Sequence, residues 1–530
     1  MQGKYGSTAA STLVENSSIT SYNGAGISAM SGQLIANNFD IRAGFNPVTN
    51  ATTTSRGAYG INANSNSNVI LNNGRIETFG DYGNGIFAAN DSSDTRQVKL
   101  QVDNVDIITH GSNATGIENI HVRSVINGGS IHTYGLGGHG VGSSNGGVAS
   151  WAPSHVTLTG TKITTEGESA YGLVATTKST IDGRGLTIST SGESAIGARS
   201  HGTGMVTLSQ GTAIKTAGDY AHGAAVTFGS QMDISDTSIE TTGQNAAGIY
   251  LVGYNTPENV TPVTKHVNRV NVAGSTITAA KGPALRVGGG ATSTFNLENS
   301  HVRGTGDDAL LFSSADYIYD DGTNVIPMPV GTASVNAQGS LLEGDIVAAS
   351  GIVDFNLRDK SLLKGAARVS ETGGILDRLA IDTTSGWEIT GASTLNDLES
   401  AGTISFAAPG SAGFKTLTVK GDFTSSDSLF VLNSKLGDDG SETDRLIFEG
   451  NVSGTSSVSV NNAGGLGALT LGDGIMIVDA AKASNDAFVQ QGRIAAGAYD
   501  YTLFAEDRSG NFDGKWYLRS SYNPAPTPDP

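Results

Sequence analysis

The sequence contains no cysteine, and charged residues occupy only 15% of its 530 positions. The missing cysteine excludes disulfide bridges, thiolate metal sites and cysteine nucleophiles. No stretch comes near the roughly 20 apolar residues that a membrane-spanning helix requires. Basic residues are also few, because 31 Lys and Arg against 49 Asp and Glu give a net charge of −18. A chain without a basic run is a poor ligand for nucleic acid, so we expect no nucleic-acid partner.

Glycine is abundant instead, with 73 residues, about twice its average share. There is no Gly-X-Y period, which excludes collagen. Hydrophobic residues make up 37% of the chain and recur throughout it, which argues against bulk disorder. A chain of this length holds either three or four ordinary domains or one long repeat structure.

A repeat of about 25 residues favours the second alternative. Each copy has an apolar anchor, with Thr two positions later and Gly four positions later. A small residue follows seven positions after the anchor, and a second Gly follows nine positions after it. The clear anchors are Ile76, Ile107, Ile131, Ile163, Ile188, Ile214 and Ile239, and weaker copies begin at Ile19, Ile41, Ile277 and Val302. The last four clear anchors are separated by 25, 26 and 25 residues.

Each copy reads as short strands between glycine turns, with a two-residue alternation such as Val156 and Leu158. Such a unit cannot bury its apolar face alone, but stacked copies can. We therefore predict an all-β fold, a right-handed parallel β-helix that is a single-stranded solenoid of roughly twenty coils. At ~4.8 Å per coil, it would be about 100 Å long. The glycine columns are expected to need positive φ or close backbone approach.

The regularity of the repeat changes along the chain. Residues 1–312 are expected to form regular coils with insertion loops, and 313–415 less regular coils that begin with a loop at 313–331. Residues 416–520 are expected to form a C-terminal cap, and the proline-rich residues 521–530 a linker.

Two C-terminal stretches resemble a known family. Residues 466–520 contain Leu466-Gly-Ala-Leu-Thr-Leu-Gly-Asp-Gly-Ile-Met-Ile-Val-Asp479, Gly492-Arg-Ile-Ala-Ala-Gly-Ala-Tyr-Asp-Tyr-Thr-Leu503 and Trp516-Tyr-Leu-Arg-Ser520. They are similar to the C-terminal folding core of pertactin-like bacterial autotransporter passengers. Residues 387–454 resemble the coils that precede this core.

The resemblance implies type V secretion through the periplasm and the outer membrane, with a C-terminal β-barrel as the partner of this chain during secretion. It also implies a position on the bacterial cell surface or in the medium, and an autochaperone role for the last coils. Within them we assign the folding core to Gly497, Tyr499, Trp516 and Leu518. The first residues lack the features of a signal peptide, so either a leader has been removed or the chain is cytosolic.

Catalytic patterns are weak. Gly437-Asp-Asp-Gly-Ser441 is the nearest string to a serine-protease nucleophile segment, but it reads as a polar turn without an organised histidine. β-Helices also host polysaccharide-active enzymes, which need clustered carboxylates. The acidic pair Asp307–Asp308, close to Arg303, occupies turn positions of a weak copy. We therefore predict no enzymatic activity and no cofactor.

One column of carboxylates resembles a cation site. Glu168, Glu193 and Asp219 hold the same position in three successive copies, and stacking would place them ~5 Å apart. They either share Ca²⁺ or are solvated turn residues, and we favour the solvated turn. His139 and His222 also share a position, but three coils put them ~14 Å apart, too far for one metal. No metal site is predicted.

The inserts lead to a functional hypothesis. Relative to a 25-residue coil, extra residues occur at about 46–56, 90–96, 143–155 and 253–266, all expected at one position of the coil. Inserts on one side of a solenoid commonly bind ligands, although plain excursions are also tolerated there. The candidate ligand-binding residues are Trp151, His155, Tyr254 and Lys265, because exposed aromatic residues are common anchors in recognition. For Trp151 the alternative, that it shields the edge of a coil, stays open.

We therefore hypothesise a non-enzymatic adhesin and virulence factor that attaches to a host-cell or extracellular-matrix ligand. Two alternatives remain open. One is self-association between neighbouring cells, which would support aggregation or biofilm. The other, ranked last, is a β-helical polysaccharide-active enzyme.

Overall fold

The computed structural model describes residues 10–53, 56–64, 66–90, 98–146, 152–254, 265–307, 309–320, 325–328, 331–369, 373–411 and 413–523. Every regular element in these ranges is a β-strand, and they contain no helix that could cross a membrane. The chain divides into two compact units. The first comprises Met1–Ser293 with Thr305–Asp308, and the second comprises Thr294–Gly304 with Ala309–Pro530.

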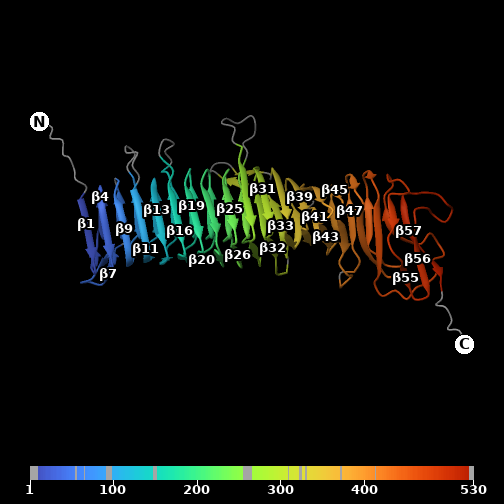
Figure 1. The fold of residues 1–530 in the computed structure, drawn as a ribbon, viewed down its shortest axis with the longest axis horizontal. Coiled ribbons are helices and arrows are strands. Elements are labelled where there is room, and N and C mark those ends of the chain that lie inside the picture. Colours follow the sequence, from blue (N-terminus) through green and yellow to red (C-terminus); the bar gives the residue numbers. More distant parts are fainter. Residues whose placement is uncertain are drawn as a thin grey trace. The chain divides into compact units, whose positions relative to one another are not determined.

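In its described residues, the first unit stacks ten coils, and each coil gives a strand segment to each of three faces whose strands pair in parallel. Figure 1 shows these strands stacked side by side in sequence order, from blue to green. The first face contains β1 (Ala10–Glu15), β4 (Gly32–Asn37), β9 (Asn68–Thr78), β11 (Val98–Thr109), β13 (Val122–Asn127), β16 (His155–Thr159), β19 (Thr180–Arg184), β22 (Met205–Ser209), β25 (Gln231–Ser235) and β28 (Val267–Ala273). The second face contains β2 (Ser18–Ser21), β5 (Asp40–Ala43), the later halves of β9 and β11, β14 (Ser130–Thr133), β17 (Lys162–Thr165), β20 (Thr187–Thr190), β23 (Ala213–Thr216), β26 (Ser238–Thr241) and β29 (Thr276–Ala279). The third face contains β3 (Ile27–Met30), β8 (Ile61–Asn64), β10 (Ile86–Ala89), β12 (Ile117–Ile120), β15 (Val141–Ser144), β18 (Leu173–Thr176), β21 (Ala198–His201), β24 (Ala224–Thr227), β27 (Ile249–Val252) and β30 (Leu285–Gly288).

The repeat anchors form one buried column. Ile163 pairs with Ile188, which pairs with Ile214, and the same register continues to Ile239. All four side chains are at most 1% exposed. Alternate residues of each strand therefore fill a shared interior, and the predicted parallel β-helix is confirmed.

The threonine two positions after each anchor is also buried, and its hydroxyl closes the following turn. Thr165 Oγ1 donates to the Ala170 carbonyl at 2.6 Å, and Thr190 Oγ1 donates to the Ala195 carbonyl at 2.6 Å. The same bond recurs in the other clear copies from Thr78, Thr109, Thr133, Thr216 and Thr241. The sequence showed this column, but not its function as an internal hydrogen-bond ladder.

The glycine columns are explained by close approach in the regular coils. A Cβ on Gly192 would lie 2.0 Å from the Gly167 carbonyl oxygen, and one on Gly197 would lie 2.3 Å from Ile214 Cγ2. Positive φ instead falls on the sixth position after the anchor, at Ser194 (55°) and Tyr220 (56°).

Two local expectations are wrong. The insert near residue 50 contains the antiparallel pair β6 (Phe45–Asn46) and β7 (Ala51–Thr52), and it lies between the second and third faces rather than after the third. Residues 313–331 are not a plain loop, because β34 (Tyr317–Asp320) and β35 (Val325–Met328) pair as an antiparallel hairpin. A hairpin closes on itself and so interrupts the stack without following its register.

The second unit contains seven complete coils in its described residues, followed by β54, a second-face strand of a further coil, which brings the described total close to the number predicted. Its first-face strands are β31 (Thr292–Glu298), β36 (Thr332–Gln338), β39 (Ile352–Arg358), β42 (Ile375–Ile381), β45 (Asp397–Ser400), β48 (Phe423–Ser425) and β51 (Val452–Ser453). The second-face strands are β32 (His301–Gly304), β37 (Leu341–Glu343), β40 (Leu362–Lys364), β43 (Gly386–Ile389), β46 (Thr403–Phe406), β49 (Ser428–Ser434), β52 (Ser456–Asn462) and β54 (Phe488–Gln490). The third-face strands are β33 (Leu310–Ala315), β38 (Asp345–Ala348), β41 (Ala367–Val369), β44 (Ser393–Leu395), β47 (Thr416–Val419), β50 (Arg445–Phe448) and β53 (Ile475–Asp479).

Antiparallel strands close the C-terminal end of this unit. β57 (Lys515–Tyr522) pairs with β53 and β56 (Tyr499–Phe504), and β55 (Ile494–Ala496) pairs with β56. Trp516 is 1% exposed, and its ring centroid lies 4.9 Å from that of Phe488. Leu518 is fully buried, Gly497 turns the β55–β56 hairpin at φ +58°, and the Tyr499 ring contacts Tyr522 at 5.6 Å. The four residues thus all lie in the cap, while their role in folding stays a prediction.

Candidate functional site

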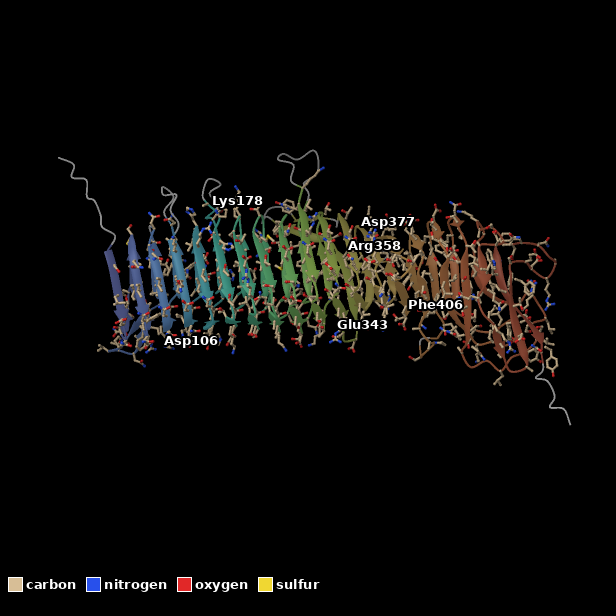
Figure 2. The ribbon with its side chains drawn as sticks, viewed as in Figure 1. Asp106, Lys178, Glu343, Arg358, Asp377 and Phe406 are labelled. Atoms are coloured by element: carbon tan, nitrogen blue, oxygen red, sulfur yellow. The ribbon has the colours of Figure 1, made fainter. Side chains whose placement is uncertain are left out.

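Three of the four inserts leave the first unit at one corner, between the third and first faces. They follow β10, β15 and β27, whereas only three residues separate β21 from β22 at the same corner. Lys178, which is exposed, also lies at this corner (Figure 2). Most of the insert residues fall outside the described ranges, and the described part of this corner consists of the strand ends that flank them.

Tyr254 and His266 lie at the two ends of the insert that follows β27. The Tyr254 backbone N–H donates to His266 Nδ1 at 3.2 Å, and the two rings meet edge to face with centroids 4.8 Å apart. Phe228, one coil earlier, contacts both rings at 5.8 and 5.6 Å. Because such aromatic contacts are geometrically specific, they fix the start and the end of this insert against the coil below it.

The contacts continue from Phe228 across the earlier coils. The His201 ring meets Phe228 at 5.3 Å, and Arg199 Nη2 donates to His201 Nδ1 at 3.0 Å. Arg199 Nη1 also donates to the Tyr171 hydroxyl at 3.2 Å, and its guanidinium lies 5.3 Å from the Tyr171 ring centroid.

The Tyr171 ring in turn stacks on His139 at 4.7 Å and 9°. We call the seven residues of this series the corner ridge: His139, Tyr171, Arg199, His201, Phe228, Tyr254 and His266. The ridge crosses the third face. His139 and Tyr171 precede β15 and β18, at the corner between the second and third faces, whereas Phe228, Tyr254 and His266 lie at the insert corner. The ridge thus joins the coil whose insert follows β15 to the coil whose insert follows β27.

A parallel contact lies beside the ridge on the third face. The His222 and Tyr250 rings are 4.6 Å apart, and the Arg286 guanidinium lies 5.5 Å from the Tyr250 ring centroid. His222 Nδ1 accepts a hydrogen bond from the Ala247 N–H at 2.9 Å, as His139 Nδ1 does from the Tyr171 N–H at 3.0 Å. Each ring therefore caps a backbone donor of the next coil.

These hydrogen bonds require neutral imidazoles. Burial, and then the nearby Arg199, lowers the pKa of His139 to about 4. Burial, followed by Arg199 and His266, lowers the pKa of His201 to about 4. Burial and the charge of Arg286 lower the pKa of His222 to about 3. The three rings thus stay uncharged at neutral pH, and arginine supplies the positive charge of this surface.

The candidate ligand-binding residues have different positions. Trp151 lies outside the described residues. His155 lies in β16 rather than in an insert, since it pairs with Arg123 and Thr180 in neighbouring coils. Its Nδ1 lies 2.5 Å from Thr180 Oγ1. Lys265 is exposed at the end of the third insert, and Tyr254 belongs to the ridge.

The carboxylate column has the expected register. The Ser169 N–H donates to the Glu193 carbonyl, and the Ser194 N–H donates to the Asp219 carbonyl, each at 2.8 Å. All three acidic residues, Glu168 included, are exposed, and Asp219 Oδ1 accepts the Gln244 N–H at 2.8 Å. No group of three or more His, Asp or Glu residues in the described ranges could hold a metal ion.

The remaining acidic and serine candidates give no further site. Asp308 lies outside the described residues. At the serine string, the Ser441 N–H donates to the Asp438 carbonyl at 3.1 Å, which is a turn geometry. Of the ridge residues, the sequence analysis selected only Tyr254, because most contacts of the ridge join different columns of the repeat. The contact between His139 and Tyr171 could have been predicted from the sequence, because both rings lie eight positions after an anchor in successive coils.

Comparisons with known proteins identify the C-terminal region. Residues 393–503 match the Autochaperone Domain Type 1 family, so the resemblance at the C-terminal end is confirmed. The chain is 43% identical over 124 residues to the adhesin BmaC autotransporter of Brucella suis biovar 1, covering 22% of this chain and 4% of that protein. It is 42% identical over 110 residues to the autotransporter adhesin AIDA-I of Escherichia coli, covering 21% of this chain and 8% of that protein.

A longer match covers more of the chain. This chain is 28% identical over 396 residues to the BrkA autotransporter of Bordetella pertussis, and the match covers 69% of this chain and 38% of that protein. The chain thus spans well under two thirds of the length of each of these relatives.

Proposed function

Since this chain is an autotransporter passenger, displayed at the outer-membrane surface or released from it, we propose that it is a non-enzymatic adhesin. Its ligand would be a component of a host-cell surface or of the extracellular matrix. Two relatives, BmaC and AIDA-I, are named adhesins. The parallel coils provide a rigid support, and the inserts provide additional surface outside the core.

The observation that carries this proposal is the common corner of three inserts and the ridge between two of them. Each ring or guanidinium of the ridge contacts the next, from His139 to His266. Such a surface is preorganised, so less conformational entropy is lost when a partner binds. Aromatic and arginine side chains are also the residues that most often dominate binding energy at interfaces. The ridge uses its polar atoms to position rings, an arrangement suited to binding rather than to chemistry.

The test is adhesion by bacteria that display the chain. In one variant, residues 253–266 are replaced by the Gly-Thr-Gly turn of residues 202–204, which closes the same corner between β21 and β22. We expect adhesion to cultured cells or matrix-coated plates to fall by about tenfold or more. Shortening the β6–β7 hairpin at the other corner is the matched control and should leave adhesion unchanged. Equal adhesion by the wild type and the 253–266 variant, at equal surface levels, would contradict the proposal.

The same strains test self-association. Settling of a cell suspension reports contact between cells, with no host component present. If the 253–266 variant settles more slowly but adheres normally to host surfaces, the corner serves cell–cell contact instead.

A further inference from the structure

The second face of the first unit contains a groove that lies away from the insert corner. It has a volume of about 260 Å³ and crosses four successive coils, from β17 to β26. Its lining includes Thr164, Ser189, Ser191, Lys215, Ala217 and Glu240. None of these residues belongs to the corner ridge, so the groove is a separate feature of the same unit.

A change of side-chain size along one column opens this groove. The column is the third position after each anchor, and its earlier members Phe79, His110 and Tyr134 stack at 4.6 and 5.1 Å. After Tyr134 the same column holds Glu166, and then the smaller residues Ser191, Ala217 and Thr242. Backbone hydrogen bonds keep it in register, with the Ser191 N–H on the Thr165 carbonyl and the Ala217 N–H on the Thr190 carbonyl. The surface is therefore hollow where the large rings end.

The deeper lining offers little to a charged ligand. Thr165, Thr190 and Thr216 line the groove, but their hydroxyls donate to the carbonyls of Ala170, Ala195 and Ala221 at 2.6 Å. The walls of the groove also carry hydroxyl groups, on Thr164 and Ser189, that take no part in this internal hydrogen-bond ladder. Lys215 and Glu240 form an ion pair at 2.9 Å, with side chains 69% and 45% exposed.

The backbone of this face cannot accept an added strand. Strands β17, β20, β23 and β26 pair with one another along the stack, so their N–H and C=O groups point to neighbouring coils. A peptide lying across the outer face would find no backbone partners, and an extended peptide normally gains its affinity from them. A ligand that carries its own hydroxyl groups has partners in the serine, threonine, lysine and glutamate side chains of the walls.

The charge around the groove favours neutral ligands over anionic ones. Glu166 and Glu240 lie in or next to the groove, the single lysine in its lining is already paired, and the chain carries a net charge of −18. Like charge opposes the approach of a polyanion. The groove is thus unsuited to sulfated or carboxylated polysaccharides.

The shape of the groove, the hydrogen-bonding groups of its walls and its charge all favour one class of ligand. We propose that this groove binds a neutral oligosaccharide that lies along the axis of the coils. Coils follow one another at ~4.8 Å, a spacing close to the length of one pyranose ring in an extended glycan. Successive sugars would therefore lie against successive coils. This inference rests on the proposed adhesin role and deepens it by naming a ligand class for a second surface.

The test is direct binding by the purified full chain. Calorimetric titrations use hexasaccharides of N-acetylglucosamine and of glucose, both β-1,4-linked, with a heparin hexasaccharide as the anionic probe. We expect at least one neutral hexasaccharide to bind with Kd below about 1 mM, and heparin not to bind. Ala217→Trp fills the groove from an exposed position and should raise Kd by about tenfold or more. Thr187→Trp, on the same face but outside the lining, should leave Kd unchanged.

Lys215→Gln keeps the shape of the groove and should weaken binding without affecting the melting temperature. Absence of binding by both neutral sugars would overturn the proposal, as would tighter binding of heparin or an unchanged Kd in Ala217→Trp. The 253–266 variant should bind the sugar normally. Failure of the groove proposal is thus read from sugar binding, and failure of the adhesin proposal from adhesion of the insert variant.

Discussion

The internal threonine ladder makes a quantitative prediction. Thr190 is 3% exposed, and its hydroxyl donates to the Ala195 carbonyl at 2.6 Å. Thr190→Val keeps the volume and the branched shape of the side chain but removes the donor. The carbonyl oxygen of Ala195, inside a turn between two coils, then loses this hydrogen bond without gaining access to water.

The expected cost follows from the burial. A buried acceptor left without its partner costs about 1–3 kcal/mol. Because coils in a solenoid contact mainly their neighbours, this cost should appear as local opening of the turn rather than as global unfolding. A free-energy change of this size corresponds to amide hydrogen exchange that is about 5- to 150-fold faster.

Hydrogen exchange resolved by peptide or residue is the assay. Faster exchange is expected at the Ser194 N–H, which donates to the Asp219 carbonyl at 2.8 Å across this turn. Thr187→Val, an exposed position on the same strand, is the control and should change stability by less than about 0.5 kcal/mol. If Thr190→Val exchanges as slowly as the wild type, the ladder does not stabilise the turns and the reasoning is refuted.

Three further predictions test other parts of the structure. Gly197→Ala should destabilise the first unit by about 1–3 kcal/mol in thermal melts, because its Cβ would lie 2.3 Å from Ile214 Cγ2 and 2.5 Å from the Gly223 oxygen. Gly410→Ala is the control, because no atom lies within 4 Å of its Cβ. His222 has a folded-state pKa of about 3, against about 6.5 when unfolded, so the unfolded state binds more protons and His222 weakens the fold as pH falls from about 6.5 towards 3. His222→Asn, which offers Oδ1 in place of Nδ1, should therefore show a smaller drop in melting temperature between neutral pH and pH 4. Leu518→Ala, at a fully buried position, should cost about 2–5 kcal/mol and lower the yield of refolding from urea, whereas Leu471→Ala, at a 79% exposed position, should affect neither.

The sequence predicted the stack because one signal is repeated at fixed spacing. Anchors 25 or 26 residues apart, such as Ile163 and Ile188, can share a column only if the coils lie in parallel register. The glycine columns were read less completely. They remain glycine because a neighbouring backbone or side chain occupies the space of a Cβ, while positive φ falls on residues such as Ser169 and Tyr220. Close approach depends on the distance between coils, which a single copy does not reveal.

The proposed binding surface was less predictable. Tyr254 was selected as an aromatic residue within an insert, but its partners Phe228 and His266 hold different positions of the repeat. Contacts between neighbouring columns depend on side-chain rotamers, which the periodicity does not fix. The hairpin at β34–β35 was missed because residues 313–331 were interpreted as a loop. Pro327 nevertheless lies within β35, since proline is accepted at the edge of a strand.

Cross-linking between neighbouring coils tests the central claim most directly, and the absence of native cysteine makes it clean. Thr164 and Ser189 are register partners on β17 and β20, so their Cα atoms lie within the range that a disulfide can span. We predict that Thr164→Cys/Ser189→Cys forms an intramolecular disulfide under mild oxidation. Thr164→Cys/Lys215→Cys, two coils apart, should not. Failure of the first pair to cross-link, or equal cross-linking by both pairs, would contradict a stack of parallel coils in register.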